Sequence, residues 1–321
     1  MERDTDPELL TDVLWINTSR RRFNEEGCCA MIGVVVVPLD GSELAGQILP
    51  YARQIADHLR IPLHLLRVIP PDASAGTRDQ AYAYLSETGG GLHHPFHMSV
   101  RLGNTSEQII ALADEVDNPI IAMTTHGRGG LGRLLYGSVA DQVVREANIP
   151  VLLIRSGTRP ATGVALRSIM VPLDGSAHAE AALPHAVELA GAFDADLWLV
   201  RAVETPLVVG GPLSAFALAG AYRQALLEAE AYLRAVAERL DSEGVRVRTR
   251  LLTGYAEDEI LAFGDEAEVE LVVMATRGRT GVGRLTLRDL AGHLLRRGNA
   301  PVMMVRTVSV LTEERPQLVV Q

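Results

Sequence analysis

A glycine-rich stretch at residues 125–138, THGRGGLGRLLYGS, combines five glycines with two arginines, Arg128 and Arg133. Glycines let a backbone fold around an anion, and arginines add charge-assisted hydrogen bonds to phosphate. Gly137-Ser138 precedes an apolar pattern typical of a helix, whose N-terminus attracts anions. We therefore predict a phosphate-binding loop rather than a merely flexible connection, with Ser138 as the helix N-cap and Asp141 completing a weak capping box.

Two other groups of residues suggest chemistry that their context argues against. Asp40-Gly41-Ser42 with His126 resembles part of a catalytic triad, but the chain has no G-x-S-x-G motif, and the Asp-Gly-Ser step is better interpreted as a helix entry. The segment HHPFH, at 93–97, offers three histidines without a carboxylate or cysteine at ligand spacing, so a solvated loop is favoured over a metal site.

The glycine-rich stretch has a near copy, TRGRTGVGRLTLRD, at 276–289. The segment VVVPLDGSELAGQILPYA at 35–52 likewise returns at 169–186 as IMVPLDGSAHAEAALPHA. The offset is 134 residues early in the repeat and 151 later, so the second copy carries 17 extra residues in its middle. The chain is therefore a tandem duplication.

Each copy alternates strand and helix patterns, which predicts a parallel sheet with helices on both faces. In the first copy we expect one helix over 43–59, kinked at Pro50, and another over 105–117 with Thr105 as N-cap. A helix over 77–87 is followed by a glycine loop, whereas its counterpart at 214–240 is much longer. The expected strands are 33–38, 62–68, 97–102, 120–124 and 151–155, then 169–172, 197–203, 245–252, 271–275 and 302–305.

The sequence is predicted to divide into an N-terminal extension (1–30), a first domain (31–156), a linker (157–166), a second domain (167–307) and a tail (308–321). Each domain is expected to be a doubly wound, Rossmann-like α/β unit with a five-stranded parallel sheet of order 3-2-1-4-5. The fifth strands are apolar edge strands in that order.

Composition narrows the choice of partners and compartment. The net charge of −10 argues against nucleic acid or an anionic membrane as the main partner. All 30 basic residues are arginines, which excludes lysine-dependent mechanisms. The two cysteines are adjacent, at Cys28-Cys29, and neither a signal peptide nor an apolar run of membrane-spanning length is visible, so we expect a cytoplasmic protein.

Taken together, VPLDGS after the first strand, MTTHGRGGLGRLLYGSVADQVV after the fourth and IPVLLIR at the end resemble the universal stress protein family. The resemblance covers about 33–155 and 168–306, and it implies a tandem member of that family. Nucleotide-binding members carry the pattern G-x2-G-x9-G-[ST], of which Gly127 and Gly137-Ser138 reproduce the second part, while Thr124 replaces the first glycine.

The resemblance implies a set of nucleotide-binding residues in the first copy. Asp40 and Val68 would lie against the adenosine with Met123 and Thr124 close by, and Gly127, Gly137, Ser138 and Val139 would hold the phosphates. The strand-end residues Pro38 and Leu39, and the loop residues Arg128, Gly130 and Arg133, complete the candidate site. The second copy has Ala275, Arg288 and Asp289 at three motif positions, and although Asp289 is expected to cap the helix, its carboxylate would repel a phosphate.

The expected function is therefore binding of ATP or a related adenine nucleotide, with Mg²⁺ on the nucleotide, in the first domain of a stress-response sensor or regulator. Family members pair their fifth strands between subunits, so the two copies are expected to pair within the chain as a pseudo-dimer, and homodimerisation stays open. An interaction scaffold without nucleotide and a slow ATPase are the alternatives, and no catalytic or metal-ligating residue is assigned.

Overall fold

In a computed structural model, the chain is described over residues 30–91, 95–125, 137–155, 166–206, 212–241, 244–277 and 287–307. The candidate residues Gly127, Arg128, Gly130 and Arg133, together with His93, His94 and His126, lie outside these ranges.

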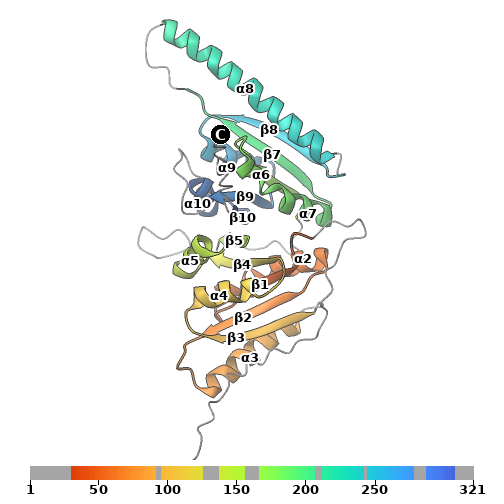
Figure 1. Cartoon of the computed structure of the whole chain (residues 1–321), viewed down its shortest axis with the longest axis vertical. Coiled ribbons are helices and arrows are strands. Elements are labelled where there is room, and N and C mark those ends of the chain that lie inside the picture. The colour runs from red at the N-terminus through yellow and green to blue at the C-terminus, as the bar shows by residue number, and fades with distance from the viewer. Residues whose placement is uncertain are drawn as a thin grey trace, which may run out of the picture.

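Both repeats form strands from apolar runs and helices between them (Figure 1). The elements of the first repeat are β1 (Val34–Pro38), α1 (Glu43–Gly46), α2 (Leu49–Leu59), β2 (Leu63–Ile69), α3 (Ala75–Gly90), β3 (Phe96–Leu102), α4 (Thr105–Asp114), β4 (Pro119–Thr125), α5 (Ser138–Glu146) and β5 (Val151–Arg155). Those of the second are β6 (Ser168–Pro172), α6 (Ala177–Glu180), α7 (Leu183–Phe193), β7 (Asp196–Val203), α8 (Pro212–Asp241), β8 (Val247–Thr253), α9 (Ala256–Glu266), β9 (Leu271–Arg277), α10 (Leu287–Arg297) and β10 (Val302–Thr307).

The strands form a single ten-stranded sheet of order β3-β2-β1-β4-β5-β10-β9-β6-β7-β8. Each half therefore has the predicted order 3-2-1-4-5, and pairing within each half is parallel. The central strands are buried on both faces, as their apolar runs predicted, whereas the outer strand β3 is partly buried and β8 is largely exposed. One core lies between the sheet and α2, α3, α7 and α8, and the other between the sheet and α4, α5, α9 and α10.

The predicted pairing of the two fifth strands within the chain is confirmed. β5 and β10 run antiparallel, with Leu152 opposite Met303. The guanidinium of Arg155 donates to the carbonyl of Arg296 at the end of α10, at 2.9 Å. In return Arg306 donates to the carbonyl of Arg145 at the end of α5, at 2.6 Å. The two pairs are related by the repeat offset of 151 residues, so this seam has approximate twofold symmetry.

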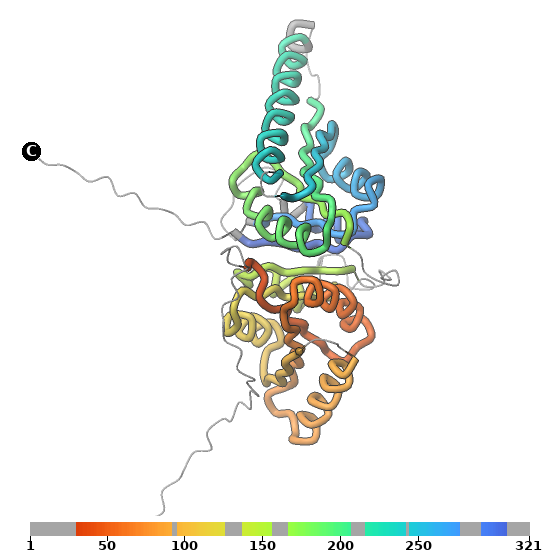
Figure 2. The backbone as a smooth tube through the Cα atoms, turned by 90° about the vertical axis from the view of Figure 1, so that its right-hand side faces the viewer, coloured from red at the N-terminus to blue at the C-terminus, as the bar shows by residue number. Residues whose placement is uncertain are grey.

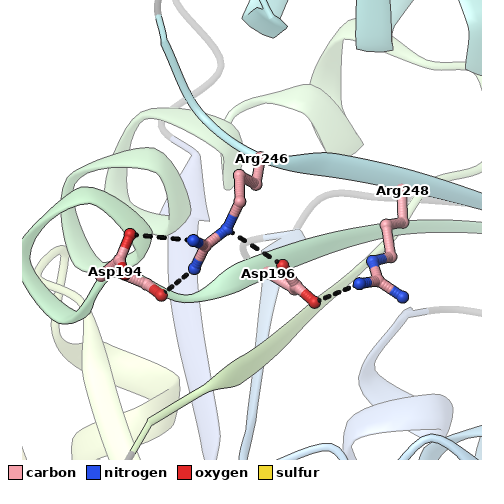
Figure 3. Close-up of polar contacts among 4 residues, drawn as sticks. All are labelled: Asp194, Asp196, Arg246 and Arg248. Carbon is pink, nitrogen blue, oxygen red and sulfur yellow. Dashed lines mark hydrogen bonds and ion pairs between the residues drawn. The ribbon is translucent and has the colours of Figure 1, made fainter.

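The sheet ends in two outer strands, β3 and β8. Arginines mark the β8 edge, where Arg246, just before the strand, pairs with Asp194 and Asp196 at 3.2 Å each. Arg248 pairs with Asp196 at 2.8 Å, as Figure 3 shows. Exposed charges on an outer strand discourage pairing with a further strand.

Several local expectations were wrong. Pro50 does not kink one helix: the segment forms two, and Pro50 lies in the first turn of α2, where its missing N–H has no helical partner to lose. Asn104, not Thr105, caps α4, and its Oδ1 accepts from two backbone N–H groups. The helix predicted to end at residue 87 continues through Gly90 as α3, so the predicted glycine loop starts later than expected. Within the described ranges, none of the helices combines the length and apolarity needed to cross a bilayer.

Candidate functional site

The carboxyl end of β1 forms the first wall of the candidate site. Pro38 ends the strand, and the buried Leu39 extends its pairing by donating to the carbonyl of Leu66 at 2.8 Å. Asp40 is exposed, and its Oδ1 accepts from the backbone N–H of Ser42 at 2.8 Å. Ser42 in turn caps α1 by accepting from the N–H of Ala45 at 3.1 Å. The Asp-Gly-Ser step is therefore a helix entry, as predicted.

The end of β4 lies beside β1 and brings Met123 and Thr124 to the same edge of the sheet. Both side chains are buried, at 7% and 8% exposure. The Thr124 hydroxyl is buried without a hydrogen-bond partner among the described residues. A buried hydroxyl without a partner costs about 1–3 kcal/mol, so this oxygen favours a ligand or a water that would satisfy it.

Helix α5 begins at the same edge, because it runs back from the end of β4 to the start of β5 and those strands are parallel. The prediction of Ser138 as N-cap was wrong. Gly137 is the N-cap, with φ 67°, and no side chain caps the helix. Asp141, which was expected to complete a capping box, is buried and pairs with Arg145.

The uncapped start leaves the N–H groups of Ser138, Val139 and Ala140 without partners inside the helix. The N–H of Asp141 is the first that bonds within it, to the carbonyl of Gly137 at 2.9 Å. The positive φ of Gly137 is a conformation that suits glycine, and the lack of a Cβ leaves room for a group in front of the helix.

Strand β2 contributes Val68, which is partly buried, and a neighbour, Arg67, that the sequence analysis missed. The Arg67 guanidinium lies 5.2 Å from the centre of the Tyr84 ring. It also lies close to Gly41, where an added Cβ would stand 2.3 Å from Arg67 Nη1. The second repeat has the same arrangement, with Arg201 over Tyr232 at 5.1 Å and against Gly175. Arg67 and Arg201 are 134 residues apart, the same offset as Asp40 and Asp174. This correspondence was the signal in the sequence that could have identified the two arginines.

The second repeat departs from the first where the phosphate site is expected. Asp174 again accepts from the N–H of Ser176, at 2.9 Å. However, Ala275 replaces Thr124, and α10 begins at Leu287, two residues before the position equivalent to Ser138. Asp289 therefore lies inside the first turn and is not the N-cap that was expected. In α10, the residues at the positions equivalent to Gly137 and Ser138 are therefore part of the helix.

A histidine cluster lies apart from this edge, on β2 and β3. The His64 ring bonds to the Ser99 hydroxyl at 2.8 Å, and its centre is 5.7 Å from that of the His97 ring. Burial, assisted by the neighbouring His97 and Arg101, lowers the pKa of His64 to about 4. Among the described residues, no group of three His, Cys, Asp or Glu side chains is arranged to hold a metal.

The sheet order and the alternating helices define a doubly wound α/β fold that is built twice in one chain. The model of the Universal stress protein family matches residues 31–155 and 165–306, so the chain belongs to that family. It is 30% identical over 144 residues to a universal stress protein of Methanocaldococcus jannaschii, covering 44% of this chain and 82% of that protein. It is 26% identical over 198 residues to one of Mycobacterium tuberculosis, covering 62% and 64% respectively.

The crystal structure of a universal stress protein from Archaeoglobus fulgidus shares the fold, with a TM-score of 0.64 and 18% identity. The match covers 85% of this chain and 98% of that one. Two further solved universal stress proteins are complexes with cAMP and with dAMP, and they cover 39% and 38% of this chain at TM-scores of 0.34 and 0.31. Those ligands belong to those proteins, so the ligand of this chain is argued below from its own residues.

Proposed function

We propose that this universal stress protein binds ATP or a related adenine nucleotide in its first repeat and acts as a sensor or regulator in a stress response. The observation that carries the proposal is the start of α5, which no described side chain caps, at the same sheet edge as the Thr124 hydroxyl, which has no hydrogen-bond partner among the described residues. Free N–H groups at a helix start suit phosphate, and a hydroxyl without a partner suits the polar edge of a nucleoside.

The remaining candidate residues fit around such a ligand. Asp40 is exposed at the end of β1 and offers a carboxylate oxygen to ribose hydroxyls, while Val68 and Met123 offer apolar surface to a base. Pro38 and Leu39 form the strand end behind them. The loop residues Gly127, Arg128, Gly130 and Arg133 remain predicted phosphate contacts, and Mg²⁺ would enter on the phosphates of the nucleotide.

The second repeat is proposed to bind nucleotide weakly or not at all. Helix α10 begins early and carries Arg288-Asp289 in its first turn, where α5 has Gly137-Ser138. We therefore expect one nucleotide per chain. Equilibrium dialysis of the full chain with ATP measures this stoichiometry, and two saturable sites per chain would contradict the proposed asymmetry.

Variants at the two ends of the site test where the nucleotide binds. Gly137→Val should weaken ATP binding by blocking approach to the helix start, and Asp40→Asn by replacing the carboxylate oxygen that would face the ribose with an N–H donor. Gly191→Val is the matched control, because Gly191 is exposed on α7 in the second repeat and a Cβ there meets nothing within 4 Å. Since valine at φ 67° also strains the backbone, the thermal midpoint of each variant is measured alongside. ATP binding that survives both site variants would refute this placement.

Thr124→Val gives a second readout that does not depend on backbone strain. Valine keeps the shape of threonine and removes the unpartnered oxygen, so the ligand-free protein should become more stable. If the hydroxyl contacts the nucleotide, ATP affinity should fall in the same variant. A less stable ligand-free variant would show that the hydroxyl is already satisfied within the protein.

Phosphate release from ATP, measured on the same samples, separates binding from slow hydrolysis. Release that disappears in Gly137→Val and Asp40→Asn would favour the ATPase alternative. Release that is unaffected by both variants would come from a contaminant. Adenine nucleotide that copurifies with the chain, detected after heat extraction, would argue against a scaffold that binds no nucleotide.

A further inference from the structure

Helix α8 has two halves with different surroundings. Its C-terminal half packs on the sheet through Ala229, Leu233, Val236 and Leu240, which are 0–4% exposed. Before Ala229, none of the helix side chains that the structure describes is buried. At 30 residues the helix is about 45 Å long, and both views show its N-terminal half extending past the sheet (Figures 1 and 2).

The N-terminal half carries an apolar stripe that faces away from the rest of the chain. Leu218, Tyr222 and Leu226 are partly covered and continue the packed face of the helix. Phe216 and Leu227 lie on the opposite face and are 85% and 56% exposed. Large apolar side chains exposed on a projecting helix are typical of a binding surface.

The spacing of this outer stripe is that of a helix–helix contact. Phe216, Gly220, Arg223 and Leu227 follow one another at intervals of four, three and four residues, the pattern of positions that face a partner helix in a coiled coil. A Cβ added at Gly220 would meet nothing within 4 Å. Bare backbone between two large apolar side chains lets a second helix approach closely.

The symmetric spacing of this stripe favours another copy of this chain as the partner. Two chains of net charge −10 repel each other, but residues 212–222 carry no charged side chain. Beyond them the stripe has both signs, because Arg223, Glu230 and Arg234 are all exposed. The intervals of four, three and four residues are the same in both directions, so in an antiparallel pair Phe216 of one copy meets Leu227 of the other and Gly220 meets Arg223, and each contact occurs twice.

Three strands that could receive a strand from a second copy, β5, β10 and β8, are less available for it. β5 and β10 pair with each other inside the chain, and the outer strand β8 is marked by the arginines of Figure 3. We propose that the chain forms a homodimer by antiparallel packing of the outer faces of two α8 helices. Phe216 of each copy packs against Leu227 of the other, and the side chain of Arg223 packs across Gly220.

Sedimentation velocity of the full chain over a range of concentrations tests this dimer. The unaltered chain should sediment as a dimer, and Phe216→Glu and Leu227→Glu should each shift it to monomer at concentrations where the unaltered chain is paired. Ala221→Glu is the matched control, because it adds the same charge to an exposed position of the same helix outside the stripe. Far-UV circular dichroism confirms that α8 stays folded in each variant.

Exchange of the two apolar residues provides an independent measurement. Phe216→Leu combined with Leu227→Phe should keep the dimer, because each antiparallel contact is only reversed, whereas Gly220→Leu should weaken it by holding the two helices apart. A chain that is monomeric at every concentration would overturn the proposal. So would a dimer that persists in both glutamate variants, or flotation with phosphatidylcholine vesicles that is lost in the same variants, which would assign the stripe to a lipid surface.

Discussion

Acidification should destabilise the first repeat through one side chain, His64. This histidine lies on β2, is 7% exposed, and bonds to the Ser99 hydroxyl at 2.8 Å. Burial disfavours its charged form, and His97 and Arg101 add to the effect while Glu115 opposes it. Together they lower the pKa of His64 from 6.5 to about 4. Lowering the pH from 7 to 5 should therefore destabilise the chain with His64 more than a variant without this imidazole.

The sign follows from proton binding in the two states. Between pH 6.5 and pH 4 the unfolded chain binds a proton at His64 and the folded chain does not, so acid favours unfolding. The contribution of His64 is fully present above pH 6.5 and is lost as the pH falls towards 4. Between pH 7 and pH 5 the loss is about 2 kcal/mol, and by pH 4 most of the roughly 3 kcal/mol that separates the two pKa values is lost.

Urea unfolding followed by far-UV circular dichroism at pH 7 and pH 5 measures this loss. In His64→Gln the amide replaces the hydrogen bond and cannot titrate, so the variant should lose about 2 kcal/mol less than the unaltered chain over that interval. Other carboxylates and histidines titrate equally in both proteins and cancel in the comparison. Equal losses in the two proteins would refute the burial argument for His64.

Two pairs of matched substitutions test local geometry. Gly41→Ala should cost about 1–2 kcal/mol, because Gly41 has φ 83° and a Cβ there would stand 2.3 Å from Arg67 Nη1; Gly46→Ala, whose nearest neighbour is 4.0 Å away, should cost nothing measurable in urea midpoints. Asn104→Ala should cost about 1 kcal/mol because it removes the cap of α4, whereas Ser138→Ala should leave stability unchanged because Ser138 caps nothing. Equal losses within either pair, by denaturation or by amide exchange of the two helices, would contradict these assignments.

The architecture was predictable because it depends on patterns that repeat along the chain. Apolar runs of four or five residues mark the buried strands β1, β4, β5, β9 and β10, and their alternation with helical patterns indicates the fold class. The strand order and the pairing of β5 with β10 came from resemblance to a family, and both are confirmed. The long α8 followed from the 17 surplus residues of the second copy.

The details of the candidate site were less predictable because they depend on which residue starts a helix. Ser138 is a good N-cap by type, but Gly137 takes that role with a backbone angle that serine disfavours. In α10 the helix starts earlier and Asp289 becomes an interior residue. The orphan hydroxyl of Thr124 and the stack of Arg67 on Tyr84 depend on contacts between distant segments, which no local pattern contains.

The seam between β5 and β10 changes how the two sites can evolve. In a dimer of identical chains, one substitution alters both sites at once. Here the partner is supplied by the same polypeptide, so the effective concentration of one half around the other is high and a modest interface suffices. Arg155 and Arg306 exchange equivalent contacts across that interface even though the residues at the starts of α5 and α10 have diverged. Tethering thus lets one half lose a ligand site while the assembly keeps its symmetry.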